Sequence, residues 1–139
     1  MKSSFLTLLS LFFAPTIMLA QMKDYKVVFD LTSKDTAAHR TVLRYIDLIT
    51  KEAPDAQLEV VFYGQSLDMV RNDKSTMTSD VGNAVKKGGV SFVVCEAAMR
   101  RHNITKDQLL TGIKTVPDGI YELITKQRQG WGYIKVVPQ

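Results

Sequence analysis

The chain alternates between short runs of β-branched and aromatic residues and segments whose apolar residues recur three and four places apart. This alternation constrains the fold more than any other feature of the sequence. The short runs predict five strands, at residues 25–30, 58–63, 90–94, 113–116 and 131–137. The periodic segments predict helices at residues 42–51, 78–87, 96–102 and 118–129, with a shorter helical piece at 67–71. Strands separated by helices pair in parallel, because tight hairpins are too few to allow antiparallel neighbours.

The predicted strands are apolar at successive positions, as at Val27-Val28-Phe29 and Phe92-Val93-Val94. Strands buried on both faces show this pattern, so we expect helices on both sides of the sheet. The fold class is therefore α/β, a three-layer α/β/α domain with a mainly parallel five-stranded sheet. One domain, residues 21–139, accounts for all of these segments. Thr78 or Ser79 is the expected cap of the helix at 78–87.

The first twenty residues have a different character. A short opening that contains Lys2 leads into an apolar run from Phe5 to Ala20, and polar Gln21 follows. This is the layout of a secretory signal peptide, and the run is shorter than the ~20 residues that a membrane-spanning helix needs. We therefore expect residues 1–20 to be removed and the chain to be exported, periplasmic or secreted, without stable membrane insertion. A retained membrane anchor is the alternative.

Composition and motifs exclude several classes of function. Without Lys2, the formal charge falls from +4 to +3 and is spread along the chain, so nucleic acid is not an expected partner. The single cysteine and two separated histidines predict neither an internal disulfide nor a metal site. Phosphate-binding, dinucleotide-binding and nucleophile-elbow glycine motifs are absent, so no cofactor is expected.

In parallel α/β sheets, ligands bind outside the carboxyl ends of the strands. This rule makes Cys95 the candidate reactive residue. The other residues that we expect to line the same edge are Thr32, Ser33, Gly64, Gln65, Ser66, Glu96 and Pro117. Two nearby acids, Asp30 and Asp35, are spaced for a turn and a helix cap and are not an acid–base pair.

Cys95 ends one predicted strand and opens a helix, a position that would stabilise a thiolate. Glu96 would oppose this effect if its carboxylate turned inward. A lone cysteine is also often a simple core residue, so a reactive and a packing role both stay open. His102 lies about 10 Å along the helix from Cys95 and cannot pair with it, and His39 could approach only through tertiary folding.

Residues 89–104, GVSFVVCEAAMRRHNI, resemble the core segment of the DsrE/DsrF-like family, in which a glycine-led strand ends in cysteine and a helix follows. Further similar segments occur in the family's order, at residues 27–33, 58–64, 116–119 and 129–135. The resemblance implies an α/β/α fold that assembles into homotrimers or hexamers. It also implies that Cys95 accepts sulfane sulfur as a persulfide, as in the related TusD-type sulfur-relay proteins, with donor and acceptor proteins as partners. The turn at Gly64-Gln65-Ser66 departs from the glycine-rich or Gly-Pro form common in the family.

Three functions follow as hypotheses. The first is a sulfur carrier that uses Cys95. The second is a non-catalytic oligomeric module that binds a small ligand or a protein, with Cys95 as a packing residue. The third is a thiol redox sensor oxidised at Cys95.

Overall fold

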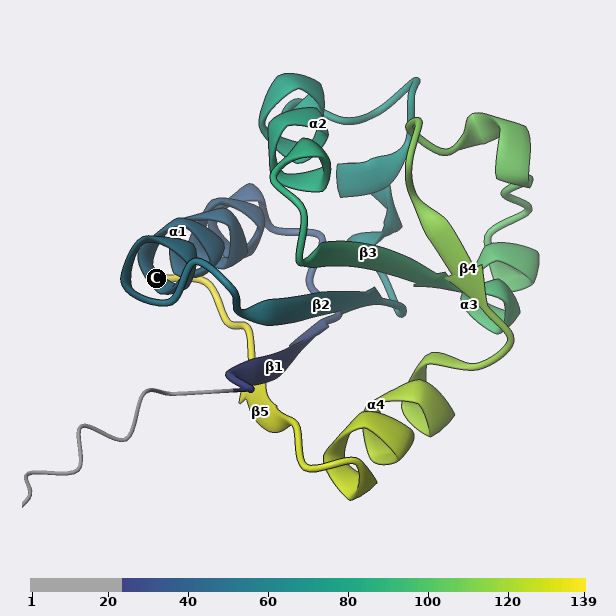
Figure 1. Cartoon of the computed structure of the whole chain (residues 1–139). Coiled ribbons are helices and arrows are strands. Elements are labelled where there is room, and N and C mark those ends of the chain that lie inside the picture. Colours follow the sequence, from purple (N-terminus) through teal and green to yellow (C-terminus); the bar gives the residue numbers. More distant parts are fainter. Residues whose placement is uncertain (1–23) are drawn as a thin grey trace, which may run out of the picture.

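The structure, a computed structural model of the whole chain, describes residues 24–139. A five-stranded sheet in the order β4-β3-β2-β1-β5 forms its centre (Figure 1). Its strands are β1 (Lys26–Leu31), β2 (Gln57–Phe62), β3 (Val90–Cys95), β4 (Lys114–Val116) and β5 (Gly132–Lys135). Every neighbouring pair is parallel, which confirms the predicted fold class.

Helices separate the strands along the chain. They are α1 (Thr36–Glu52), η1 (Ser66–Val70), α2 (Thr78–Lys86), α3 (Glu96–Arg101), η2 (Lys106–Gln108) and α4 (Gly119–Arg128), where η denotes a 3₁₀ helix. α1 and α2 lie on one face of the sheet and α4 lies on the other (Figure 1). We call these the α1 face and the α4 face.

The α1 face holds most of the core. Side chains alternate along β1, so that Phe29 and Leu31 join α1 residues such as Val42 and Ile46 in one large buried cluster. Asp35 begins α1 by accepting a hydrogen bond from the Ala37 amide at 2.8 Å, the capping role predicted for it. Burial of this extensive apolar layer anchors β1, β2 and β3 to α1 and α2.

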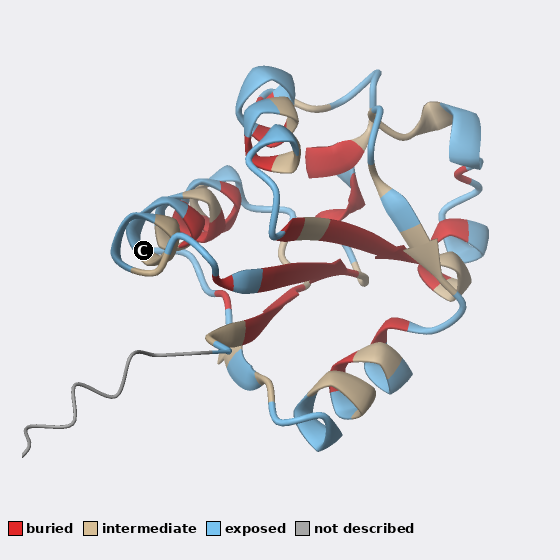
Figure 2. Cartoon of the chain, viewed as in Figure 1, coloured by how far each residue is buried: buried red, intermediate tan, exposed pale blue. Residues whose placement is uncertain are grey.

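The α4 face is packed much more thinly. Its buried cluster contains only Val28, Val61, Val93 and Leu123, and Leu123 is its only member from α4. Three large side chains of the same helix stay exposed: Ile120 at 50%, Tyr121 at 71% and Ile124 at 49%. In Figure 2, β1, β2 and β3 are coloured mainly as buried, whereas most of α4 is intermediate or exposed. The helix is therefore held on the sheet by a small apolar contact.

Two local predictions are wrong. Neither Thr78 nor Ser79 caps α2, because Met77 occupies the cap position and its carbonyl accepts a hydrogen bond from the Val81 amide at 2.9 Å. Asp30 is a buried residue of β1 and not a turn residue. The predicted signal peptide, residues 1–20, lies outside the described residues. Within residues 24–139, no helix combines the length and apolar character needed to cross a membrane.

Candidate functional site

Cys95 lies where the connections from two neighbouring strands diverge. It is the last residue of β3 and the N-cap of α3. α3 packs Ala98 and Met99 into the α1-face cluster, whereas the chain that leaves β4 crosses to the opposite face and forms α4. Ligands of parallel α/β sheets bind at such divergence points, so Cys95 stands at the site that the topology favours.

The first turn of α4 packs directly onto Cys95, whose exposed fraction is only 5%. A Cβ atom placed on Gly119 would lie 3.2 Å from the Cys95 Cβ, 3.2 Å from the Val61 Cγ1 and 3.4 Å from the Tyr63 Cβ. Only glycine, which has no side chain, lets the helix approach this closely. The amino end of a helix is positive and favours negative charge on a neighbouring sulfur atom.

Glu96 is bonded to groups other than Cys95. Its Oε1 accepts hydrogen bonds from the Thr115 hydroxyl at 2.7 Å and the Lys106 ammonium at 2.8 Å. These two bonds lower the pKa of Glu96 below its ordinary value. The carboxylate is therefore ionised and held between β4 and the η2 region.

The turn after β2 contains three of the predicted edge residues. Gly64 adopts a positive φ of 63°, and its carbonyl oxygen lies 2.6 Å from the His102 Nε2. The Gln65 amide donates to the Thr32 carbonyl at 3.0 Å, while the Gln65 side chain is exposed. The Ser66 hydroxyl is buried, 2.7 Å from the Leu31 carbonyl oxygen. This turn therefore ties the ends of β1, β2 and α3 together.

The remaining predicted residues lie on either side of that turn. Ser33 accepts a hydrogen bond from the Asp35 amide through its hydroxyl, and its carbonyl oxygen lies 2.9 Å from the His39 Nε2. Pro117 is exposed in the connection that leads from β4 to α4. His39 is buried, and burial lowers its pKa. The Nε2 atoms of His39 and His102 both contact backbone carbonyls, and among the described residues neither ring is hydrogen-bonded to Cys95.

A polar cluster that sequence reasoning missed lies beside Cys95 on the α4 face. The buried Asp30 carboxylate accepts hydrogen bonds from the Tyr133 hydroxyl at 2.6 Å and the Lys135 ammonium at 2.8 Å. Tyr63 extends this cluster towards Cys95, because the β2–β3 register aligns the residues next to Phe62 and Val94. The signal for the cluster is the pairing of Asp30 with Lys135 across β1 and β5, which becomes visible only once the strand order is known.

Both tyrosines of this cluster stay protonated at neutral pH. Burial, followed by the charge of Asp30 and a hydrogen bond to it, raises the pKa of Tyr63 well above its ordinary value. The hydrogen bond to Asp30, with some burial, raises the pKa of Tyr133 to about 12. The cluster therefore offers phenol hydroxyls and one ammonium group near the thiol.

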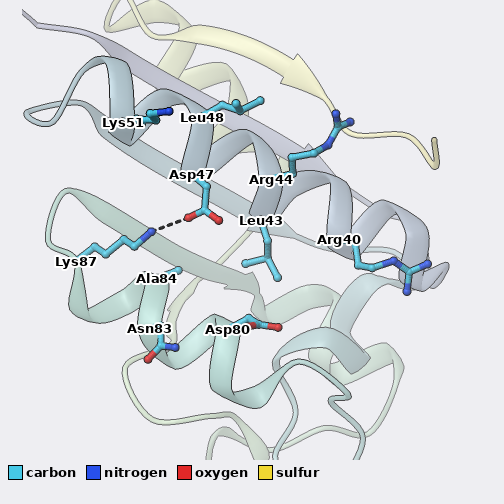
Figure 3. A pocket seen from close by; sticks show the side chains of 10 residues that line it. All are labelled: Arg40, Leu43, Arg44, Asp47, Leu48, Lys51, Asp80, Asn83, Ala84 and Lys87. Atoms are coloured by element: carbon cyan, nitrogen blue, oxygen red, sulfur yellow. Dashed lines mark hydrogen bonds and ion pairs between the residues drawn. The ribbon is translucent and has the colours of Figure 1, made fainter.

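A hollow of about 580 Å³ lies between α1 and α2 (Figure 3). Leu43 and Ala84 line it, and the Lys87–Asp47 ion pair, 2.6 Å long, crosses one end. In the part of the chain that the structure describes, no group of three or more His, Cys, Asp or Glu side chains could hold a metal ion. The hollow lies between the helices of the α1 face, whereas Cys95 packs against α4. The residues that line the hollow include neither Cys95 nor any of the residues predicted to surround it.

These features define a small parallel α/β protein with one thiol at the carboxyl edge of its sheet. The chain belongs to the DsrE/DsrF-like family, whose model matches residues 26–136 and so spans all five strands. Family membership confirms the resemblance seen in the sequence and suggests a fold of the sulfur-relay type. No curated protein matches the chain.

Several solved structures resemble the chain, and three of them each align with 81% of it. The protein of unknown function MTH1491 from Methanobacterium thermoautotrophicum has 28% sequence identity and a TM-score of 0.77, with 99% of its own chain covered. The conserved protein of unknown function BT1422 from Bacteroides thetaiotaomicron has 16% identity, a TM-score of 0.65 and 95% coverage. The ychN protein from E. coli has 11% identity, a TM-score of 0.65 and 99% coverage. The last two share the fold alone.

Proposed function

We propose that the chain is a sulfur carrier in which Cys95 accepts sulfane sulfur as a persulfide and passes it to a partner thiol. The observation that carries the proposal is the position of Cys95, the chain's only cysteine, at the divergence point of the sheet in a DsrE/DsrF-like protein. In this proposal the chain works in the same way as TusD-type sulfur-relay proteins.

The transfer consists of two thiol–persulfide exchanges. The Cys95 thiolate attacks the outer sulfur of a donor persulfide, a new S–S bond forms, and the donor leaves as a thiolate. An acceptor thiolate then attacks the outer sulfur on Cys95, and the Cys95 thiolate leaves. One sulfur atom moves in each step and no external oxidant is needed.

The burial of Cys95 favours a second candidate function. A thiol that is 5% exposed and packed against Gly119 suits a structural residue in a module that binds a small ligand or another protein. In that case the exposed side chains of α4 would serve binding, and substitution of Cys95 by serine would leave function unchanged.

The deciding experiment exposes the reduced chain, residues 21–139, to inorganic polysulfide and follows its intact mass. A carrier gains about 32 Da, one sulfur atom, and loses it to an added thiol acceptor. The comparison protein is Cys95→Ser/Ser79→Cys, which moves the thiol to an exposed position on α2. A carrier loads at Cys95 in the folded chain, and the comparison protein gives the rate for a thiol that nothing covers.

Loading at Cys95 only after denaturation would refute the carrier proposal and favour the binding module. Covalent dimers on non-reducing gels after mild peroxide, without sulfur loading, would instead indicate the redox sensor.

The proposal includes export and self-association. We expect the mature chain to begin after Ala20, which N-terminal sequencing of the exported protein tests. Light scattering tests the expected homotrimer or hexamer, and a monomer at micromolar concentration would contradict it.

A further inference from the structure

Sulfur exchange at Cys95 meets a problem of access. The incoming thiolate or persulfide must approach the sulfur along the S–S axis, yet only 5% of Cys95 is exposed. Neither the α1–α2 hollow nor a smaller one of about 270 Å³ that Gly64, Gln65 and His102 help to line includes Cys95 in its wall. The proposed function therefore requires part of the chain to move away from the thiol.

The first turn of α4 covers Cys95 from the α4 face, while the residue also belongs to the buried α1-face cluster. Gly119 is in contact with Cys95, while Pro117, Asp118 and Ile120 beside it in the chain are exposed. The cover is therefore about one residue thick. A Cβ atom on Gly119 would lie only 3.2 Å from the Cys95 Cβ, so the helix and the cysteine are in close contact here.

The two ends of α4 are held differently. At its carboxyl end, the Lys126 ammonium donates to Glu59 at 2.9 Å and lies 4.4 Å from the centre of the Trp131 ring. Near the middle, Leu123 is the buried apolar contact with the sheet. At the amino end, the Asp118 carboxylate accepts from the Tyr121 amide at 2.9 Å, a bond within the helix that does not tie it to the sheet. The covering end is therefore the weakly held end.

We propose that the first turn of α4 is a gate over Cys95, hinged at the Lys126 end, and that Leu123 sets how often it opens. The proposal rests on the carrier function, because a structural cysteine needs no access. Leu123 acts as a positioning residue: it touches no substrate but decides how fast the thiol reacts. Segments with few buried apolar contacts open locally without global unfolding.

The test measures alkylation of Cys95 by iodoacetamide in the folded chain, residues 21–139. Leu123→Ala removes the apolar anchor of α4, and the expected result is alkylation at least about tenfold faster than in wild type. Ile46→Ala is the matched control, because it removes a fully buried side chain from α1 on the other face. It should change the rate less than about twofold. Urea denaturation of both variants measures their loss of global stability.

Hydrogen exchange provides a second readout. Amides in the first turn of α4 should exchange faster than those of β3, and Leu123→Ala should accelerate the former alone. If Leu123→Ala fails to fold, Asp118→Ala takes its place, because it removes only the bond that caps the first turn.

Two outcomes would overturn the gate. If Leu123→Ala and Ile46→Ala lose the same stability and both speed alkylation equally, iodoacetamide reaches Cys95 through global unfolding and not through a gate. Wild-type alkylation as fast as in the denatured chain would mean that no cover exists. The carrier proposal fails separately: a Leu123→Ala chain that is alkylated quickly but takes up no sulfur from polysulfide would keep the gate and exclude the carrier.

Discussion

The buried ion pair under α4 gives a prediction that can be worked out from the structure. Glu59 projects from β2 onto the α4 face, 5% exposed, and its Oε2 accepts from Lys126 at 2.9 Å. Its other oxygen, Oε1, is buried without a hydrogen-bond partner among the described residues. At an effective dielectric constant of about 20, two unit charges at this distance attract by about 6 kcal/mol. Burial of the two charges costs several kcal/mol for each ion.

The pKa of Glu59 indicates which effect is larger. Burial raises the pKa of this carboxyl group above its ordinary value despite the opposing attraction of Lys126. The charged form is therefore less favourable in the folded chain than in water. We expect Glu59→Gln to leave the free energy of unfolding unchanged or to raise it by up to about 1 kcal/mol at pH 7. Lys126→Met leaves a buried carboxylate with no cation beside it and should lower that free energy by about 3 kcal/mol.

Urea denaturation of residues 21–139 measures these changes, with Glu59→Gln/Lys126→Met expected to recover most of the loss. Glu52→Gln, a substitution of an exposed glutamate at the end of α1, is the control and should have no effect.

The effect of Glu59 on stability should also depend on pH, with a defined sign. Because the pKa of Glu59 is raised in the folded chain, protonation of this carboxyl group favours folding. The stabilisation is complete below the pKa of the unfolded chain, near 4.5, and is lost as the pH rises through the pKa of the folded chain. Wild type should therefore gain stability relative to Glu59→Gln as the pH falls from 7. A loss of more than about 1.5 kcal/mol in Glu59→Gln, at all pH values, would refute the reasoning.

Three further substitutions test other parts of the structure by urea denaturation. Asp30→Ala should destabilise the chain by about 2 kcal/mol, because it removes the hydrogen bonds that Tyr133 and Lys135 donate to the buried carboxylate; these two donors on β5 can partly turn to water instead. If stability is unchanged, β5 is held on the sheet by its backbone hydrogen bonds alone. His39→Gln should make the fold less sensitive to acid. Because burial lowers the pKa of His39 in the folded chain, the stability associated with the neutral ring is complete above the unfolded pKa of about 6.5 and is lost as the pH falls through the folded pKa. An unchanged pH profile would contradict that assignment. Gly119→Ala should cost about 1–3 kcal/mol through overpacking against Cys95, whereas Gly82→Ala, with open space around it on α2, should be neutral or stabilising; equal effects would show that Gly119 is not tightly packed.

Hydrophobic periodicity was sufficient to predict the sheet. The apolar runs at residues 27–29 and 92–94 predict strands buried on both faces, and the structure places them in β1 and β3 at the centre of the core. The carboxyl-edge rule selected Cys95 as a candidate without knowledge of the strand order, because the rule depends only on which residue ends a strand, and the structure places Cys95 at the end of β3.

The surroundings of Cys95 could not be predicted in the same way. Asp30 reads locally as a turn residue; its true partners, Tyr133 and Lys135, lie on the last strand and meet it only because β5 pairs with β1. The contact between Cys95 and Gly119 likewise depends on where α4 crosses the sheet. Long-range pairing decides both features, and local spacing carries no information about it.

The pairing of β5 with β1 has a consequence for how the molecule is made. β5 and α4 are the last elements of the chain, yet β5 completes the sheet beside the first strand, and the tail after it donates from the Val136 amide to the Asp30 carbonyl. During synthesis from the amino end, β3 and its terminal thiol leave the ribosome before α4 exists to cover them. The nascent chain therefore passes through a stage in which Cys95 is open to any oxidant or electrophile in its compartment, and only completion of the final forty or so residues shields it.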